Sequence, residues 1–252
     1  MKISDSHFHL DSTKPLKKSV DLLREKSYLN NIENLLVISL KNEPWTYKEF
    51  CQEIEKVKNV YYVREIDPTE NYKKVLNEIS ASNASGIKLH PRLRNFNLQN
   101  KNLYKIIERC ENINLDIVVI CSFWDGAWNK YKLSENQFAD LADTFPNQKF
   151  LWAHSGGHKI LDFMFMARRR ENVFLDTSFT QNYFFSGSVL SDLIYSINSL
   201  PDKFLFGSDF EFLDYKKTLD KLVSKFKENG IEKDVIEKLM FSNFKRLFND
   251  NG

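Results

Sequence analysis

The sequence contains only three cysteines, Cys51, Cys110 and Cys121, among its 252 residues. Their number is odd and none is spaced as CxxC, which argues against a disulfide framework or a zinc ribbon. Charge of one sign is also missing, because 36 Lys and Arg balance 34 Asp and Glu to a formal net charge of +2. The composition therefore does not indicate nucleic acid or an anionic membrane as a partner.

Long apolar runs are absent as well. The longest, such as 117–121, have about five residues, whereas a membrane helix needs about 20. The first five residues contain no apolar signal core, so we expect a cytoplasmic protein with reduced thiols. The sequence does have 42% hydrophobic residues, including 21 Phe, which is enough for a substantial core.

Short β-branched or aromatic runs alternate with stretches of helical period, and no repeat or linker interrupts them. The predicted strands are 2–7, 35–40, 60–66, 86–90, 116–121, 149–154, 172–176 and 203–207. The predicted helices are 15–30, 44–57, 69–82, 98–112, 134–145, 158–170, 188–198, 214–229 and a last one at 233–248. Eight strand–helix pairs predict a single α/β domain, 1–252, that forms a (β/α)₈ TIM barrel with an additional C-terminal helix. A doubly wound open sheet is the rival, but no glycine-rich loop follows the first strand.

All five histidines fall at or just after the end of a predicted strand: His7, His9, His90, His154 and His158. In a barrel, the carboxyl ends of the strands meet on one face, and catalytic groups lie there. We therefore expect these imidazoles to gather near one mouth.

The first and last predicted strands carry the strongest candidates for a metal site. His7 and His9 are two residues apart, so their side chains point the same way and can share one ion, although a pair of hydrogen-bonded structural histidines is the alternative. Asp5 has the same parity and could orient an imidazole or simply be a strand-bottom acid. Asp209 follows the last strand, which adjoins the first in a closed barrel, and could complete the coordination or cap a helix.

Two further residues end the sixth and seventh strands. His154 precedes a Ser-Gly-Gly segment and could be a ligand, a general acid or base, or a structural residue. Asp176 could assist the chemistry or serve the hydrogen bonding of the barrel.

The end of the fourth strand is basic. Lys88 and His90 face one way, and the lysine could hold an anionic substrate group or a developing oxyanion, or else pair with a neighbouring acid. Arg92 and Arg94 extend the segment and could bind a carboxylate through two hydrogen bonds, or lie in a solvated loop.

Taken together, these segments resemble the metal-dependent amidohydrolase superfamily, and more narrowly the branch of aminocarboxymuconate semialdehyde decarboxylase and related hydrolases. The segments that match, in order, are Asp5-x-His7-x-His9, Gly86-Ile87-Lys88-Leu89-His90-Pro91, Ala153-His154-Ser155-Gly156-Gly157, Phe206-Gly207-Ser208-Asp209 and the tail 243–248. Each is weak alone, but their order along nearly the whole chain is specific. The resemblance implies one divalent ion, Zn²⁺ before others, on His7, His9 and Asp209. It also implies His154 as the base for a metal-bound water, with Asp209 as its catalytic companion.

The sequence departs from this family at the fifth strand, where Cys121 stands in place of a usual ligand histidine. Three interpretations remain open: a thiolate ligand of Zn²⁺, a small buried thiol beside a site with fewer protein ligands, or a degenerate site without turnover. After this strand, Trp124, Asp125 and Trp128 could wall the mouth or pack against the helices.

The predicted activity is hydrolysis of an amide, lactone or ester of a small anionic substrate that Lys88, His90 or Arg92 orients. Decarboxylation of an unsaturated acid and a non-catalytic binding barrel are the alternatives. A nucleic-acid role rests only on the basic run 168–170, which we interpret as a helix C-terminus whose charges complement the helix dipole. An aromatic content of 14% allows an exposed patch and hence a homo-oligomer.

Overall fold

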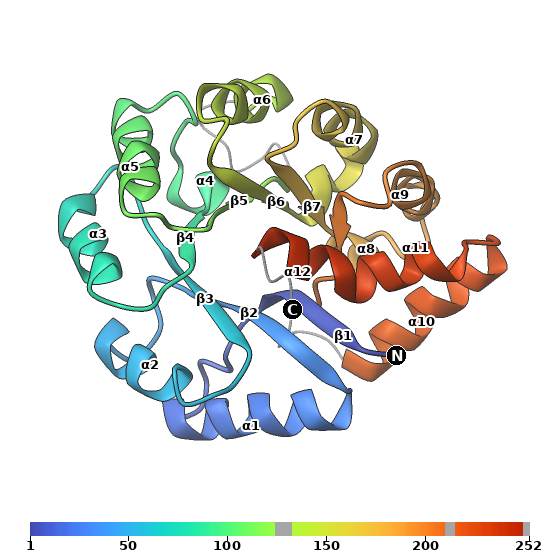
Figure 1. The fold of residues 1–252 in the computed structure, drawn as a ribbon, viewed down its shortest axis with the longest axis horizontal. Coiled ribbons are helices and arrows are strands. Elements are labelled where there is room, and N and C mark those ends of the chain that lie inside the picture. The colour runs from blue at the N-terminus through green and yellow to red at the C-terminus, as the bar shows by residue number, and fades with distance from the viewer. Residues whose placement is uncertain (124–132, 210–214, 249–252) are drawn as a thin grey trace.

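The computed structural model describes residues 1–123, 133–209 and 215–248. Eight parallel strands follow one another in chain order around a ring, with helices outside it (Figure 1). The strands are β1 (Ile3–Phe8), β2 (Ile32–Ser39), β3 (Val60–Glu65), β4 (Gly86–Leu89), β5 (Ile117–Cys121), β6 (Lys149–Ala153), β7 (Val173–Asp176) and β8 (Phe204–Leu205). This arrangement confirms the predicted (β/α)₈ barrel.

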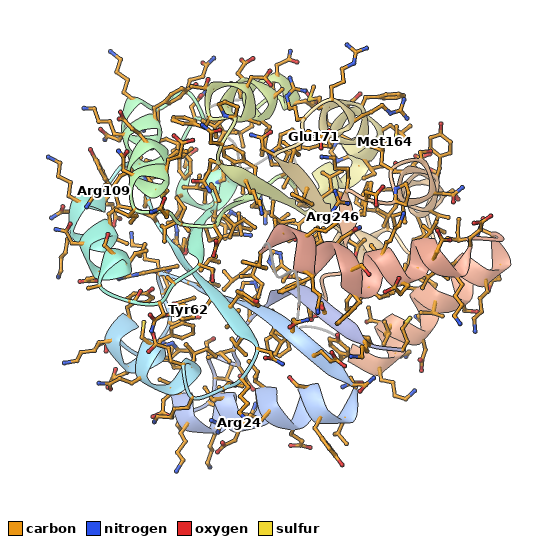
Figure 2. The ribbon with its side chains drawn as sticks, in the orientation of Figure 1. Arg24, Tyr62, Arg109, Met164, Glu171 and Arg246 are labelled. Atoms are coloured by element: carbon orange, nitrogen blue, oxygen red, sulfur yellow. The ribbon has the colours of Figure 1, made fainter. Side chains whose placement is uncertain are left out.

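The outer helices match the predicted helical stretches. They are α1 (Leu16–Leu29), α2 (Tyr47–Ile54), α3 (Tyr72–Ser80), α5 (Lys101–Asn112), α6 (Glu135–Thr144), α7 (Ile160–Arg168), α9 (Ser188–Ser199) and α10 (Tyr215–Glu228). Their charged side chains, such as Arg24 and Arg109, point away from the barrel (Figure 2). Three short segments after strands were not predicted: α4 (Pro91–Arg94), the 3₁₀ segment η1 (His154–Lys159) and α8 (Thr180–Tyr183). Trp124, Asp125 and Trp128 lie outside the described residues.

Strand residues alternate between two apolar clusters, as the period of two in a strand requires. One cluster lies between strands and helices, and the other fills the barrel. The second cluster includes Leu36, Ile38, Val63, Ile117, Val119, Leu151 and Leu205. Because the same parity continues to the strand ends, it aims Lys88, Cys121 and Asp176 toward the barrel axis.

The C-terminal helical stretch covers the amino end of the barrel. It consists of α11 (Lys233–Glu237), a π-helical turn η2 (Lys238–Ser242) and α12 (Asn243–Leu247), and it crosses the centre of the ring in Figure 1. The Lys149 ammonium donates to the Leu247 carbonyl at 2.7 Å, and the rings of Tyr61 and Phe248 stack at 4.1 Å. The predicted additional helix therefore closes the barrel interior at this end.

The first and last strands meet through hydrogen bonds that close the ring. The Ser6 amide donates to the Phe206 carbonyl at 2.9 Å, and the Asp209 amide donates to the His7 carbonyl at 2.9 Å. β8 is shorter than predicted because the Gly207 amide donates to the Thr177 hydroxyl, at 3.3 Å, instead of continuing the strand ladder. A Cβ at Gly207 would lie 2.9 Å from the His7 Cβ, so only glycine allows this close approach. None of the described helices is long and apolar enough to span a membrane.

Candidate metal centre and substrate site

Three predicted metal ligands converge at the carboxyl end of the barrel. The Asp209 Oδ1 lies 3.5 Å from the His7 Nε2 and 3.4 Å from the His9 Nε2. One ligand atom from each residue lies within 4.8 Å of the other two. The His7 side chain is buried, whereas those of His9 and Asp209 are 12% exposed and therefore reachable from solvent. Residues about 200 positions apart in sequence thus share one small volume.

Asp5 fixes the backbone beneath these ligands. Its Oδ1 accepts hydrogen bonds from the amides of His7 and Ser208, each at 3.0 Å. The carboxyl group therefore ties together the two segments that carry the ligands. It makes no hydrogen bond to an imidazole among the described residues, so of the two alternatives its contacts are those of a structural acid in the strand.

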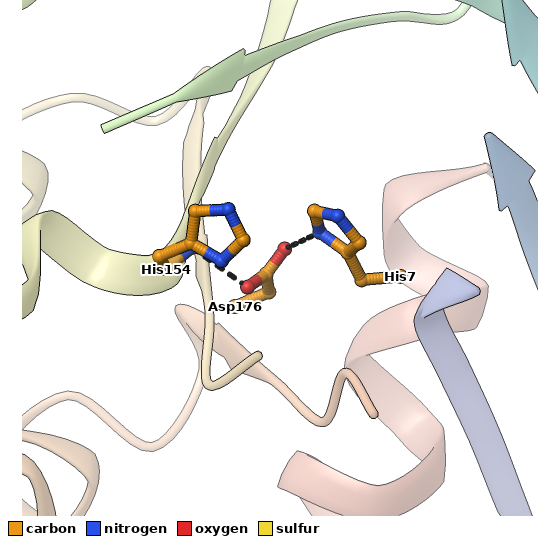
Figure 3. A group of neighbouring side chains, drawn as sticks. All are labelled: His7, His154 and Asp176. Carbon is orange, nitrogen blue, oxygen red and sulfur yellow. Dashed lines mark hydrogen bonds and ion pairs between the residues drawn. The ribbon is translucent and has the colours of Figure 1, made fainter. Parts of the chain in front are cut away.

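Asp176 instead orients the imidazole. Its Oδ2 lies 3.0 Å from the His7 Nδ1, and its Oδ1 accepts the His154 amide at 2.8 Å (Figure 3). A carboxylate at Nδ1 holds the ring proton there and leaves the Nε2 lone pair free to bind a metal. The signal in the sequence was its place at the end of a strand with inward parity, but sequence alone could not identify its partner.

The electrostatics of the cluster suit a cation. Burial lowers the pKa of His7 to about 4, and the charge of Lys88 adds to this effect, so the imidazole is neutral at neutral pH. For Asp209, burial favours the protonated acid, but the hydrogen bond from His9 and the nearby imidazoles outweigh it and lower its pKa. Neutral imidazoles with an ionised carboxylate are the donor set that Zn²⁺ binds.

His154 lies beside this cluster, with its ring 4.9 Å from that of His7. Its Nδ1 is 3.1 Å from the Ser178 carbonyl oxygen and 2.9 Å from the Ser178 hydroxyl. Because a carbonyl can only accept, the proton sits on Nδ1 and the lone pair of the neutral ring is on Nε2. His154 also forms a second close group with His7 and Asp176, whose potential ligand atoms lie within 4.8 Å of one another.

Backbone strain is concentrated at this face. Among the described residues other than Gly and Asn, a positive φ occurs only at His154 (69°), Ser155 (48°), Phe179 (58°) and Asp209 (55°). Each such conformation costs about 1–3 kcal/mol and persists where surrounding contacts enforce it. All four residues follow β6, β7 or β8, so the strain coincides with the candidate site.

Lys88 lies inside the barrel near His7. It is only 1% exposed, and its ammonium has no hydrogen-bond partner within the described part of the chain. Leaving a charge buried without a partner is costly, and an anion beside it would remove that cost. The position therefore suits an anionic group of a ligand.

His90 and Cys121 form the opposite side of the mouth. The His90 Nδ1 accepts the Leu93 amide at 3.3 Å, so this ring carries its proton on Nε2. The Cys121 thiol is buried close to His90 and His154, and its Sγ lies 3.7 Å from the Phe123 carbonyl oxygen. Burial acts to raise the thiol pKa, but the two imidazoles outweigh it and bring the pKa well below its usual value. Metal ligation by Cys121 stays a prediction.

The other basic residues have different surroundings. The Arg92 guanidinium is half-buried and lies 5.6 Å from the centre of the Phe123 ring. Arg94 binds Glu65 through two hydrogen bonds of 2.7 and 2.6 Å, so its expected carboxylate comes from the chain itself. His158 is exposed on η1.

Comparison with known proteins places this geometry in context. The family model for amidohydrolases matches residues 41–249, most of the chain but not β1. No curated protein matches the sequence. An uncharacterised TIM-barrel protein from Bordetella bronchiseptica is 17% identical, with 99% of both chains covered and a TM-score of 0.80.

Two other solved structures carry descriptions of function. A probable 2-pyrone-4,6-dicarboxylic acid hydrolase from Acinetobacter baumannii, with citric acid bound, is 14% identical over 99% of this chain and 100% of that one, with a TM-score of 0.70. An amidohydrolase from Burkholderia multivorans with bound zinc is 11% identical over 99% of both chains, with a TM-score of 0.71. At these identities the likeness shows the shared fold. The match to the family model, in contrast, shows that the chain belongs to the amidohydrolase family, whose members are in general metal-dependent enzymes.

Proposed function

We propose that this protein is a metal-dependent hydrolase that cleaves an amide, lactone or ester of a small anionic substrate. The observation that carries the proposal is the convergence of His7, His9 and Asp209, with Asp176 behind the His7 ring. An imidazole held by a carboxylate at Nδ1 and open at Nε2 is the usual arrangement of a histidine ligand.

In this proposal, the Nε2 atoms of His7 and His9 and the carboxylate of Asp209 hold one divalent ion. Nitrogen and oxygen donors favour Zn²⁺, and Cys121 stays a further candidate ligand. A bound ion of this kind acts as a Lewis acid and makes water a nucleophile near neutral pH.

His154 handles the proton in this scheme. The carbonyl of Ser178 keeps the Nδ1 proton in place, so Nε2 is the atom that accepts or returns a proton. The backbone of His154 is strained, and its amide donates a hydrogen bond to the Asp176 carboxylate. Both features hold the ring beside His7. Burial acts to lower the pKa of His154, but the Cys121 thiol outweighs it and raises the pKa, and the charge of Asp209 adds to this effect.

Lys88 would bind the anionic group of the substrate, and this contact would orient the bond to be cleaved. Its buried ammonium is the one charged group of the described site without a protein partner. The Nε2–H of His90 and the Arg92 guanidinium are further donors on the same strand end. The same residues could support decarboxylation of an unsaturated acid, which release of CO₂ would reveal.

Metal analysis combined with a substrate panel tests the proposal. We expect one zinc ion per chain in the wild type and in the control Asp220→Asn, whose carboxylate is 64% exposed on α10. Asp209→Asn should lose the ion, and its rate of hydrolysis of lactones, esters and amides should fall at least about a hundredfold. A wild-type protein that binds no divalent ion and cleaves none of the panel would be a binding barrel instead.

A further inference from the structure

A group of four aromatic rings stands beside the proposed reaction centre. Phe123, Phe179, Tyr183 and Phe184, here called the aromatic platform, contact one another with ring-centroid distances between 4.9 and 6.2 Å. Phe179 and Tyr183 stack at 5.0 Å with an angle of 19°. The Phe179 ring also lies 5.9 Å from the imidazole of His154, so the platform adjoins the residue assigned to proton transfer.

Phe179 is held rigidly in an unfavourable conformation. Its backbone has φ 58° and ψ −53°, which a bulky side chain rarely adopts. The next two residues fix it: the Thr180 hydroxyl donates to the His154 carbonyl at 2.6 Å, and the Gln181 amide group donates to the Gly207 carbonyl at 2.8 Å. Both side chains are buried, so the loop is tied to the ends of β6 and β8. Strain maintained in this way is typical of functional sites.

The Phe123 ring packs closely against the backbone of Gly157. A Cβ at Gly157 would lie only 2.4 Å from its ring, and Gly157 has a φ of +59° that favours glycine. The backbone after β6 is therefore shaped to admit this ring. Tyr183, in contrast, is 64% exposed, although a large aromatic side chain gains from burial. The platform is thus rigid underneath and open at its outer ring.

A cationic group borders the same rings: the Arg92 guanidinium lies 5.6 Å from the centre of Phe123. Lys88 lies on β4, the strand that leads into His90 and Arg92, and its ammonium has no hydrogen-bond partner in the described part of the chain. We propose that the aromatic platform selects substrates in which a planar, aromatic or conjugated ring carries the anionic group, with Phe179 and Tyr183 as specificity-determining residues. This inference rests on the proposed function, because it concerns the substrate of the same site.

Binding of two matched carboxylates tests the platform without any turnover. Benzoate and cyclohexanecarboxylate have the same charge and similar size, but the saturated ring is the more apolar, so burial alone does not favour benzoate. Ring contacts add a preference for the aromatic acid. By calorimetry on the zinc-loaded full chain, we expect benzoate to bind about fivefold to tenfold more tightly.

Variants show whether the platform is responsible for this preference. Phe179→Leu and Tyr183→Ala should bring the affinity ratio close to one, whereas the control Tyr195→Ala, 56% exposed on α9, should keep it. Equal affinities in the wild type, undetectable benzoate binding, or a ratio unchanged in both platform variants would overturn the inference. A benzoate preference in a protein that hydrolyses nothing would leave the platform standing and refute only the proposed activity.

Discussion

The two sides of the barrel mouth differ in how their charged groups are partnered. On the side of β1, β7 and β8, the buried His7 imidazole lies between two carboxylates, Asp176 and Asp209. On the side of β4 and β5, the Lys88 ammonium has no partner in the described chain, and Cys121 lies close to two imidazoles. In the proposed function, the first side would bind the cation and the second the anionic group of the substrate. A ligand with an anionic end would therefore enter in one orientation.

Replacing Lys88 should have the largest effect, because among the described residues it is the cation of the second side that lies fully inside the barrel. For Lys88→Met we expect kcat/KM for an anionic substrate to fall about 1,000-fold, equal to about 4 kcal/mol. The melting temperature without ligand should rise, because methionine fills a similar volume without a buried charge. Lys101→Met, an exposed change on α5, serves as the control. A loss of stability together with activity would show that Lys88 has a structural partner.

The pH dependence of folding stability tests the buried carboxyl group of Asp5 on the first side. Burial raises its pKa from 3.8 to about 7, so the folded protein binds this proton more tightly than the unfolded chain does, and stability is lost as the pH rises from about 4 to 7. Asp5→Asn accepts the same two backbone hydrogen bonds without ionising. In the metal-free protein we expect the variant to be more stable than the wild type by about 4 kcal/mol at pH 8, and nearly equal to it at pH 4.

His7 changes the folding stability with pH in the opposite direction to Asp5. Its pKa falls from 6.5 to about 4 on folding, so the unfolded chain binds its proton first and stability is lost as the pH falls through this window. In the wild type, the contributions of Asp5 and His7 oppose each other between pH 4 and 6.5. Urea unfolding of Asp5→Asn should therefore show a steeper rise of stability with pH over this range. A difference between the two proteins that does not vary with pH would contradict the assignment for Asp5, and a stability of Asp5→Asn that does not rise between pH 4 and 6.5 would contradict the assignment for His7.

Asp176 should have a moderate effect on metal binding. Asp176→Asn keeps the shape of the side chain but no longer fixes the proton on the His7 Nδ1. We expect zinc affinity, measured by competition with a chelator, to weaken 10- to 100-fold. Asp143→Asn, which removes an exposed ion pair with Arg170, should leave the affinity unchanged. An unchanged affinity in Asp176→Asn would argue against His7 as a ligand.

Cys121 should have the smallest effect on the metal. Since its thiol lies close to His90 and His154, Cys121→Ser should reduce turnover through His154 but change zinc affinity by less than about tenfold. Absorption of the Co²⁺-loaded protein provides the sharper measurement. A thiolate-to-cobalt band that disappears in Cys121→Ser would instead establish sulfur as a ligand.

The periodicity of the sequence was sufficient to predict the barrel, because each strand and helix has its own local apolar pattern. It failed in the short segments η1, α4 and α8, where single side chains decide the conformation. The His90 ring, for example, accepts the Leu93 amide in the first turn of α4, and Phe179 takes a positive φ that no local propensity favours.

Only part of the candidate site could be predicted from local sequence patterns. Strand parity brought His7, His9 and Asp209 together, since it depends on local structure and ring closure alone. The partners Ser208 of Asp5, His7 of Asp176 and Glu65 of Arg94 come from distant parts of the sequence, which no spacing in the sequence encodes. Asp5 and Asp176 were therefore predicted at the correct strands with two alternatives open for each, and the structure shows that Asp176, not Asp5, hydrogen-bonds an imidazole.

The hydrogen bonds that join β1 to the segment after β8 set an order for biosynthesis. His7 and His9 leave the ribosome early, whereas Asp209, whose amide binds the His7 carbonyl, follows about two hundred residues later. No nascent chain that stops before the last strand can present all three donors. If these residues hold the proposed ion, only a nearly finished polypeptide can bind it through all three side chains.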